Sequence, residues 1–181
     1  GKLFIEKKAG KLVNLESALD ASLPNVHSGI GHTRWATHGG PTDRNAHPHV
    51  DNDGKLAVIH NGIIENYTEL RAQLEAKGHK FSSETDTESV AHLLSDLRKE
   101  HNGDLTAAMR DAVKALRGSF TLLAIHADQP DVVVGVRRNS PLVVGLGKGE
   151  NFMASDVAAF IEFTKRAIEL GQDEVVTMTP T

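Results

Sequence analysis

Two hydrogen-bond donors stand side by side at Asn61 and Gly62, directly after an apolar run that ends at His60. The Asn carboxamide and an unhindered Gly backbone N–H can point at one spot, and two converging donors form an oxyanion hole. The usual alternative for Asn-Gly is a type I′ hairpin turn. Because Ile63, Ile64 and a helix-capping residue follow, we expect a strand-to-helix corner that exposes both donors.

Two charged residues have the chemistry to hold the ends of an amino acid. Arg34 lies in Thr33-Arg-Trp-Ala-Thr-His38 beside the only tryptophan, and a guanidinium can clamp a carboxylate through two hydrogen bonds. Asp86 lies in Ser83-Glu-Thr-Asp-Thr-Glu88, where a carboxylate could bind an ammonium group. Simpler interpretations remain open, namely a Trp packed under a surface Arg and helix capping by Thr85 or Asp86. Together the two charges would fit an amino-acid zwitterion.

Histidines are concentrated in one short part of the chain. Five of the ten fall between residues 32 and 60, namely His32, His38, His47, His49 and His60. His47-Pro-His49 could indicate a transition-metal site and hence a metal-dependent hydrolase. No helical His pair at i, i+4 spacing supports zinc, so we favour hydrogen-bonding roles and expect neither a metal nor a cofactor. The sequence contains no cysteine, which excludes disulfides, thiolate ligands and a cysteine nucleophile from these residues.

The composition is that of an ordinary globular domain of 181 residues with a formal net charge of −4. A mildly acidic chain without a basic stripe argues against nucleic acid as the main partner. Apolar runs are too short for a membrane-spanning helix, and no signal peptide is visible. We therefore expect a cytoplasmic protein that does not bind a membrane.

Hydrophobic periodicity and capping signals indicate which elements hold these residues. Helices are expected at 14–19, from the Asn66 cap to Gly78, after Ser83–Glu88, and from Asp104 to Gly118, with a short helix from Ser155. Strands are expected at 2–7, 28–33, 55–60, 120–126, 132–137, 142–145 and 152–154, and a hairpin from 167–170 and 174–178. This order predicts an α+β fold with an antiparallel sheet and the helix block on one face.

Five motifs, taken in order, resemble the glutaminase domain of the glutamine–fructose-6-phosphate aminotransferase family. They are Gly31-His-Thr-Arg-Trp-Ala-Thr-His-Gly-Gly, Asn45-Ala-His-Pro-His49, His60-Asn-Gly-Ile-Ile-Glu-Asn66, Ser83-Glu-Thr-Asp-Thr-Glu88 and Ser140-Pro-Leu-Val-Val-Gly-Leu-Gly with Ala154-Ser-Asp156. The resemblance covers residues 1–181 and implies a class II, N-terminal-nucleophile amidotransferase domain. The implied fold is an αββα sandwich of two antiparallel sheets between helix layers.

The resemblance also implies roles for individual residues. In that family an N-terminal Cys attacks the side-chain amide of glutamine and releases ammonia, which is used to make glucosamine 6-phosphate from fructose 6-phosphate. It implies that Asn61 and Gly62 form the oxyanion hole and that the glutamine carboxylate is bound by Arg34, Thr37 and His38. It also implies that Trp35 gates ammonia transfer and that Asp86 binds the α-ammonium group.

The sequence departs from the family pattern at its start. The Cys-Gly-Ile segment, with its strand and helix, is missing, so we expect these residues alone to be inactive and to leave an open sheet edge with exposed apolar surface. The implied partners are glutamine, the sugar-isomerase domains of the same enzyme and a second copy in a homodimer. A non-catalytic module that binds an amino acid or a protein partner remains the alternative.

Overall fold

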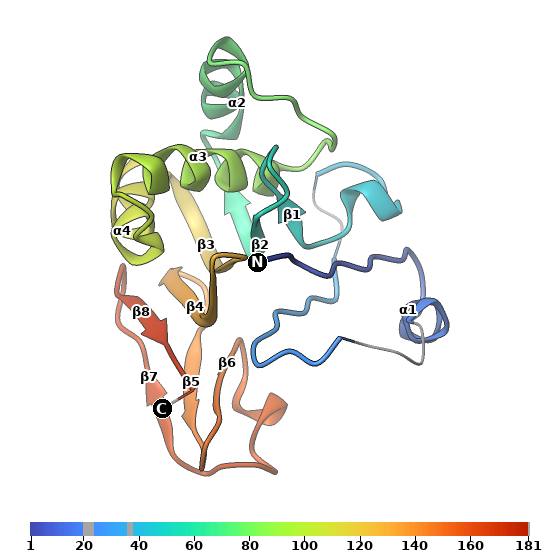
Figure 1. The fold of residues 1–181 in the computed structure, drawn as a ribbon, viewed down its shortest axis with the longest axis vertical. Coiled ribbons are helices and arrows are strands. Elements are labelled where there is room, and N and C mark those ends of the chain that lie inside the picture. The colour runs from blue at the N-terminus through green and yellow to red at the C-terminus, as the bar shows by residue number, and fades with distance from the viewer. Residues whose placement is uncertain (20–23, 36–37, 181) are drawn as a thin grey trace.

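The computed structural model describes residues 1–19, 24–35 and 38–180 (Figure 1). Its helices are α1 (Leu12–Ala18), α2 (Tyr67–Ala76), α3 (Asp86–Glu100) and α4 (Leu105–Ala115), with 3-10 turns η1 (Asp43–Asn45) and η2 (Val157–Ala159). Its strands are β1 (His49–Val50), β2 (Leu56–Ile64), β3 (Gly118–His126), β4 (Gln129–Arg138), β5 (Val143–Leu146), β6 (Asn151–Ala154), β7 (Ala167–Glu169) and β8 (Val175–Met178).

Two antiparallel sheets form the centre of the molecule. One has the order β1-β2-β3-β4-β8 and the other the order β6-β5-β7. α2, α3 and α4 pack together beside the larger sheet, whereas α1 lies at the side of the molecule (Figure 1). The expected α+β class, the antiparallel sheets and the helix block on one sheet face are therefore confirmed. The outer face of the smaller sheet carries η2 and the stacked rings of Phe152, Phe160 and Phe163.

The β2–β3 ladder divides the core into two parts. It runs in register from Leu56 opposite His126 to Ile64 opposite Gly118. Alternate residues point to opposite faces of a strand. Leu56, Val58 and Ile64 therefore pack under the helices, while Ile59 packs against the smaller sheet. The long apolar ladder holds the end of β2 rigidly in place.

The three helices of the layer follow the expected pattern but differ in capping. Thr85 occupies the N-cap position of α3, but its side chain makes no cap hydrogen bond. Asp104 caps α4 by accepting the backbone N–H groups of Thr106 at 2.8 Å and Ala107 at 3.0 Å. Asn66 precedes α2, but its side chain makes no cap bond and instead joins the carbonyl of Ala115 to the N–H of Arg117. It therefore ties α2 to the end of α4.

Three expectations for the N-terminal third are wrong. Residues 2–7 and 28–33 are not strands, because no strand among the described residues pairs with them. α1 begins at Leu12, with Lys11 and not Asn14 at the cap position; the Asn14 side chain donates to the Ala9 carbonyl at 3.1 Å. Residues 38–55 are loop, apart from η1 and the two-residue strand β1.

The expected hairpin at 167–178 is also wrong, because its two strands join different sheets. β7 pairs with β5, and β8 pairs with β4. The turn between them is anchored to β4 instead, since Asp173 donates its N–H to the Arg137 carbonyl at 2.8 Å. The helix expected from Ser155 is only the 3-10 turn η2.

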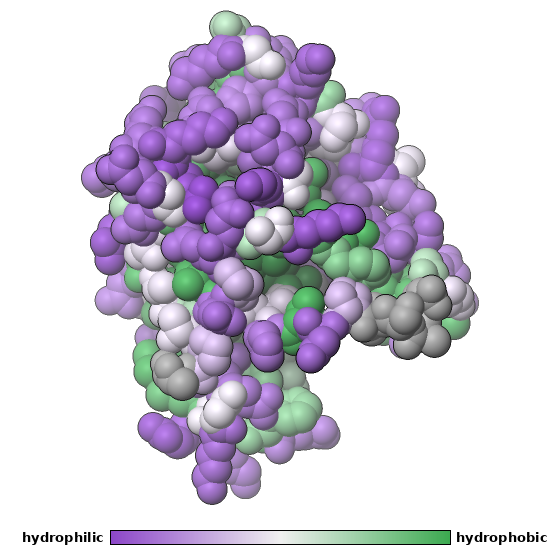
Figure 2. Space-filling model, viewed as in Figure 1, coloured by the Kyte–Doolittle hydropathy of each residue, from purple (hydrophilic) through white to green (hydrophobic). Residues whose placement is uncertain are grey.

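Apolar surface is exposed where the N-terminal segment meets the larger sheet. A cavity of about 570 Å³ lies there, with Leu3, Ile5, Ala57 and Ile125 among its walls. Figure 2 shows apolar surface at the centre of this view, below the polar helical end. β1 pairs only with Ala57 and Val58, so in the described ranges the same edge of β2 is open beyond Val58. No described helix is both long and apolar enough to span a membrane.

Candidate active site

Asn61 and Gly62 lie inside β2, opposite Thr121 and Phe120 of β3, and not at a strand-to-helix corner as the sequence suggested. Both residues are exposed. The strand continues because β3 supplies a partner up to Ile64. Asn61 opens onto a cavity of about 320 Å³ between the two sheets. The donor pair is therefore held by a sheet ladder, which is more rigid than a loop.

Gly62 is required by its backbone and by close packing. Its φ is +111°, in the region that favours glycine. A Cβ at this position would lie 2.0 Å from the carbonyl oxygen of Ser119. No other residue type fits this point of the ladder, and the N–H of Gly62 remains unobstructed by a side chain.

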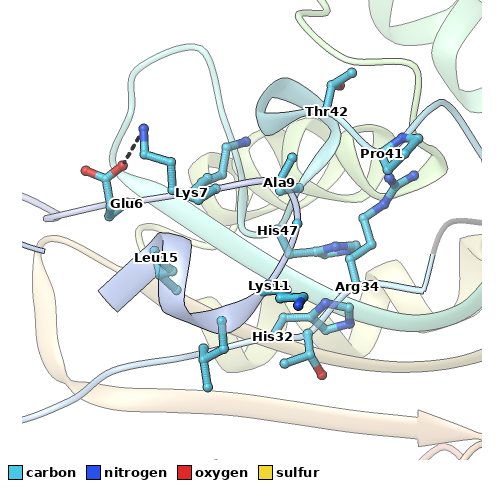
Figure 3. A pocket seen from close by; sticks show the side chains of 15 residues that line it. Glu6, Lys7, Ala9, Lys11, Leu15, His32, Arg34, Pro41, Thr42 and His47 are labelled. Carbon is cyan, nitrogen blue, oxygen red and sulfur yellow. Dashed lines mark ion pairs between the residues drawn. The ribbon is translucent and has the colours of Figure 1, made fainter. Parts of the chain in front are cut away.

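Arg34 orders the loop that follows it. Its Nη1 donates to the Gly40 carbonyl at 3.0 Å, and its Nη2 donates to the Gly39 carbonyl at 3.1 Å and to the His38 carbonyl. Arg34 lines a second cavity, of about 220 Å³, together with Lys7 and Lys11 (Figure 3). This cavity carries positive charge and shares His32 and Thr33 with the cavity beside Asn61.

Asp86 lies on the helix side of β2, at the start of α3, with only 3% of its surface exposed. Its carboxylate accepts the Ile64 N–H at 2.9 Å and lies 3.8 Å from Nδ1 of His60. It lines neither of the two cavities. The structure therefore joins Asp86 to the end of β2 and does not place it in one cavity with Arg34.

Two other predicted site residues, Trp35 and His38, follow Arg34 closely in the chain. Trp35 is 91% exposed. His38 packs edge-on against the ring of Tyr67, with a centroid distance of 5.0 Å. Thr37 lies outside the described residues. The loop is thus drawn toward the start of α2, while its tryptophan side chain faces solvent.

A cluster of imidazoles underlies the site. The ring of His47 packs at a tilt against that of His32, with centroids 4.1 Å apart, and meets the ring of His49 edge-on at 5.0 Å. The Thr87 hydroxyl lies 3.1 Å from Nε2 of His47 and 3.0 Å from Nδ1 of His60. α3 therefore anchors both rings through one hydroxyl group.

Burial keeps these rings neutral. It lowers the pKa of His49 to about 4, with the charge of Lys7 acting in the same direction. It lowers the pKa of His60 to about 4 against the opposing effect of Asp86, and it lowers the pKa of His47 further still. In the described ranges no group of three or more His, Cys, Asp or Glu side chains is arranged to hold a metal ion.

The sequence pointed to His32 only as one of five clustered histidines and assigned no role to Thr87, although both residues shape the site. His32 contacts Asn61 across the cavity wall, with 2.7 Å between Nε2 and Oδ1. The feature of the sequence that could have indicated this role of His32 is its position two residues before Arg34, in a stretch rich in polar residues. Thr87 carried no signal beyond its place in a helix-capping stretch.

Comparison with known proteins identifies the domain. Residues 32–162 match the glutamine amidotransferase domain family. Over 98% of its length the chain is 62% identical to the glutamine–fructose-6-phosphate aminotransferase [isomerizing] of Streptomyces coelicolor. Over 99% of its length it is 52% identical to the protein of that name from Aquifex aeolicus. It spans 29% and 30% of the length of these relatives.

The fold has matches among solved structures as well. The glutamine phosphoribosylpyrophosphate amidotransferase of B. subtilis aligns with a TM-score of 0.60 and 24% identity, over 83% of this chain and 34% of that one. A structure described as the allosteric regulatory enzyme of purine biosynthesis aligns with a TM-score of 0.62, at the same identity and coverage. These two likenesses support the fold. The match of residues 32–162, more than half of the chain, to the family model shows that this chain belongs to the glutamine amidotransferase domain family.

Proposed function

We propose that this chain forms the glutamine-binding, ammonia-supplying part of a glutamine–fructose-6-phosphate aminotransferase. The observation that carries the proposal is the donor pair Asn61 and Gly62 inside β2, where Asn61 lines a cavity of about 320 Å³ between the two sheets. The high identity to relatives of that name supports the choice of acceptor sugar. The overall reaction would make glucosamine 6-phosphate for hexosamine and cell-wall precursor synthesis.

The chemistry assigned to the donor pair is stabilisation of an oxyanion. Attack of a thiolate on the glutamine side-chain amide places negative charge on its oxygen, and Asn61 Nδ2 and the Gly62 N–H would receive that charge. Collapse of the intermediate releases ammonia once the leaving nitrogen is protonated, and water then hydrolyses the glutamyl thioester to glutamate. A single donor of this kind contributes about 2.7–4 kcal/mol to the transition state.

The thiolate must come from outside these residues, since none of the 181 is a cysteine. We therefore expect the chain alone to lack glutaminase activity and to contribute the binding surface and the oxyanion donors. The nucleophile belongs to the remainder of the intact enzyme, as does the sugar-isomerase part that uses the ammonia.

The ends of glutamine are assigned to charged groups around β2. Arg34, Thr37 and His38 would hold the α-carboxylate, and the positive charge around the cavity that Arg34 lines favours an anionic group. Asp86 would attract the α-ammonium from behind β2. Trp35, with its exposed side chain, would face the sugar-isomerase part and gate ammonia transfer. The proposal also takes the intact enzyme to be a cytoplasmic homodimer.

The proposal is tested with the intact enzyme that contains this chain. We expect it to release glutamate from glutamine and to form glucosamine 6-phosphate when fructose 6-phosphate is present. Treatment with a chelator should leave both activities unchanged. An intact enzyme that binds no glutamine in calorimetry, or that loses binding on chelation, would contradict the proposal.

A further inference from the structure

Asn61 can serve as an oxyanion donor only in one of its two amide orientations. With Nδ2 toward the cavity it presents N–H groups to the developing charge. Rotated by 180° about the amide, it would present its carbonyl oxygen and repel that charge. Because Asn61 is exposed, backbone packing alone does not choose between the two orientations.

The contact with His32 fixes the orientation of the Asn61 amide. Nε2 of His32 lies 2.7 Å from Oδ1 of Asn61, a short distance for an N–H···O hydrogen bond. An amide oxygen only accepts hydrogen bonds, so the proton of the contact belongs to Nε2. The oxygen is thereby turned away from the oxyanion position, and both N–H groups of the amide remain available.

The ring of His32 is itself held in place. It packs against the ring of His47 in a tilted arrangement, at a centroid distance of 4.1 Å and an interplanar angle of 33° (Figure 3). Nε2 of His47 lies 3.1 Å from the hydroxyl of Thr87 in the first turn of α3. Burial lowers the pKa of His32 and favours its neutral form, which carries a single ring proton. His32 thus reaches Asn61 from a pair of rings that is anchored to the helix layer.

We infer that His32 is the positioning residue that holds the Asn61 carboxamide with its N–H groups directed at the oxyanion. The inference rests on the proposed function and extends it, since it names a residue that acts on the reaction through Asn61. His32 itself makes no contact with the oxyanion. Its removal is therefore expected to slow the chemical step without weakening glutamine binding.

The test uses substitutions that differ in where they place a donor. His32→Gln puts an amide N–H near the place of Nε2, whereas the shorter side chain of His32→Asn reaches only the place of Nδ1. We expect His32→Asn in the intact enzyme to lower the kcat of glutamine hydrolysis about 10- to 100-fold with KM nearly unchanged. His32→Gln should restore most of the lost rate. His79→Gln, at a part-buried pair with Asp96 that lines neither cavity of the site, is the matched control and should retain full rate.

A double-mutant cycle with Asn61→Ala isolates the mechanism. If His32 acts only through Asn61, adding His32→Asn to Asn61→Ala should cause no further loss of kcat, because the two effects are not additive. Additive losses, equal losses in His32→Asn and His32→Gln, or an effect confined to KM would each overturn the inference. An unsubstituted enzyme without glutaminase activity would instead refute the proposed function.

Discussion

The carboxylate of Asp86 accepts the backbone N–H of Ile64 at 2.9 Å, in a site where both residues are buried. This bond ties the first turn of α3 to the end of β2, two residues beyond Gly62. Asp86 therefore combines a structural role with the charge that we assign to binding of the glutamine ammonium group. The two roles can be separated, because an Asn side chain retains the acceptor oxygen but loses the charge.

Asp86→Asn should weaken glutamine use while leaving the fold intact. Loss of a charged hydrogen-bond partner is worth about 1.5–3 kcal/mol, so KM for glutamine should rise roughly 10- to 100-fold. Asp86→Ala should in addition lower the free energy of unfolding by about 1–3 kcal/mol, because the Ile64 N–H loses its acceptor. Steady-state kinetics and urea unfolding of the intact enzyme measure both effects. An Asp86→Asn enzyme with unchanged KM would refute the binding role.

Asn61→Ala should slow glutamine hydrolysis about 10²- to 10³-fold in kcat if Asn61 lines the oxyanion hole. Asn52→Ala is the matched control, because Asn52 bonds only to the backbone of Lys80, outside both cavities of the site. Stopped assays of glutamate release compare the two variants. Full turnover in Asn61→Ala would show that Asn61 is a strand residue without a chemical role.

Gly62→Ala should destabilise the domain by about 3 kcal/mol or more, because the added methyl group meets the Ser119 carbonyl and φ is positive. Gly29→Ala is the comparison, since nothing lies within 4 Å of a Cβ there. It should change the free energy of unfolding by less than about 0.5 kcal/mol. Equal denaturation midpoints for the two variants would show that the ladder tolerates a side chain at position 62.

Acid should destabilise the domain through its buried histidines. The pKa of His49 is about 4 in the folded protein, against an ordinary value of 6.5 for histidine, so the unfolded chain binds more protons between these pH values. The contribution of neutral His49 is fully present above pH 6.5 and declines as the pH falls to 4. It amounts to a loss on the order of 2 kcal/mol at pH 5. His60 acts in the same direction.

Urea unfolding at pH 7 and pH 5 measures this loss. His49→Gln should flatten the dependence of the unfolding free energy on pH. A protein that is equally stable at both pH values would contradict the assignment of neutral, buried rings.

Trp35→Ala should separate glutamine hydrolysis from ammonia transfer. The side chain is 91% exposed, so its removal should change the unfolding free energy by less than about 0.5 kcal/mol. Glutaminase kcat should stay within about twofold, while more free ammonia should escape for each glucosamine 6-phosphate formed. The ratio of the two products measures coupling. A ratio equal to that of the unsubstituted enzyme would contradict the gating role of Trp35.

Local signals in the sequence predicted the elements whose stability is local. The apolar stripe of α3, the Asp104 cap of α4 and the apolar run of β2 each depend on neighbours within a few residues. The motif order predicted the family and the donor pair. Pairing partners could not be predicted in this way, because a strand forms only where another strand satisfies its backbone. Residues 2–7 and 28–33 have the pattern of strands, but no strand among the described residues pairs with them. The two strands within 167–178 join different sheets.

The groups available to chemistry can be read directly from the sequence: an Asn-Gly donor pair, Arg34, Asp86, many histidines and no cysteine. How these groups are used depends on the folded arrangement. It placed the donor pair within β2, directed Arg34 at its own loop and buried Asp86 against Ile64. It also brought His32 to Asn61 across 29 residues of chain. Such contacts depend on packing between distant segments, which no local pattern encodes.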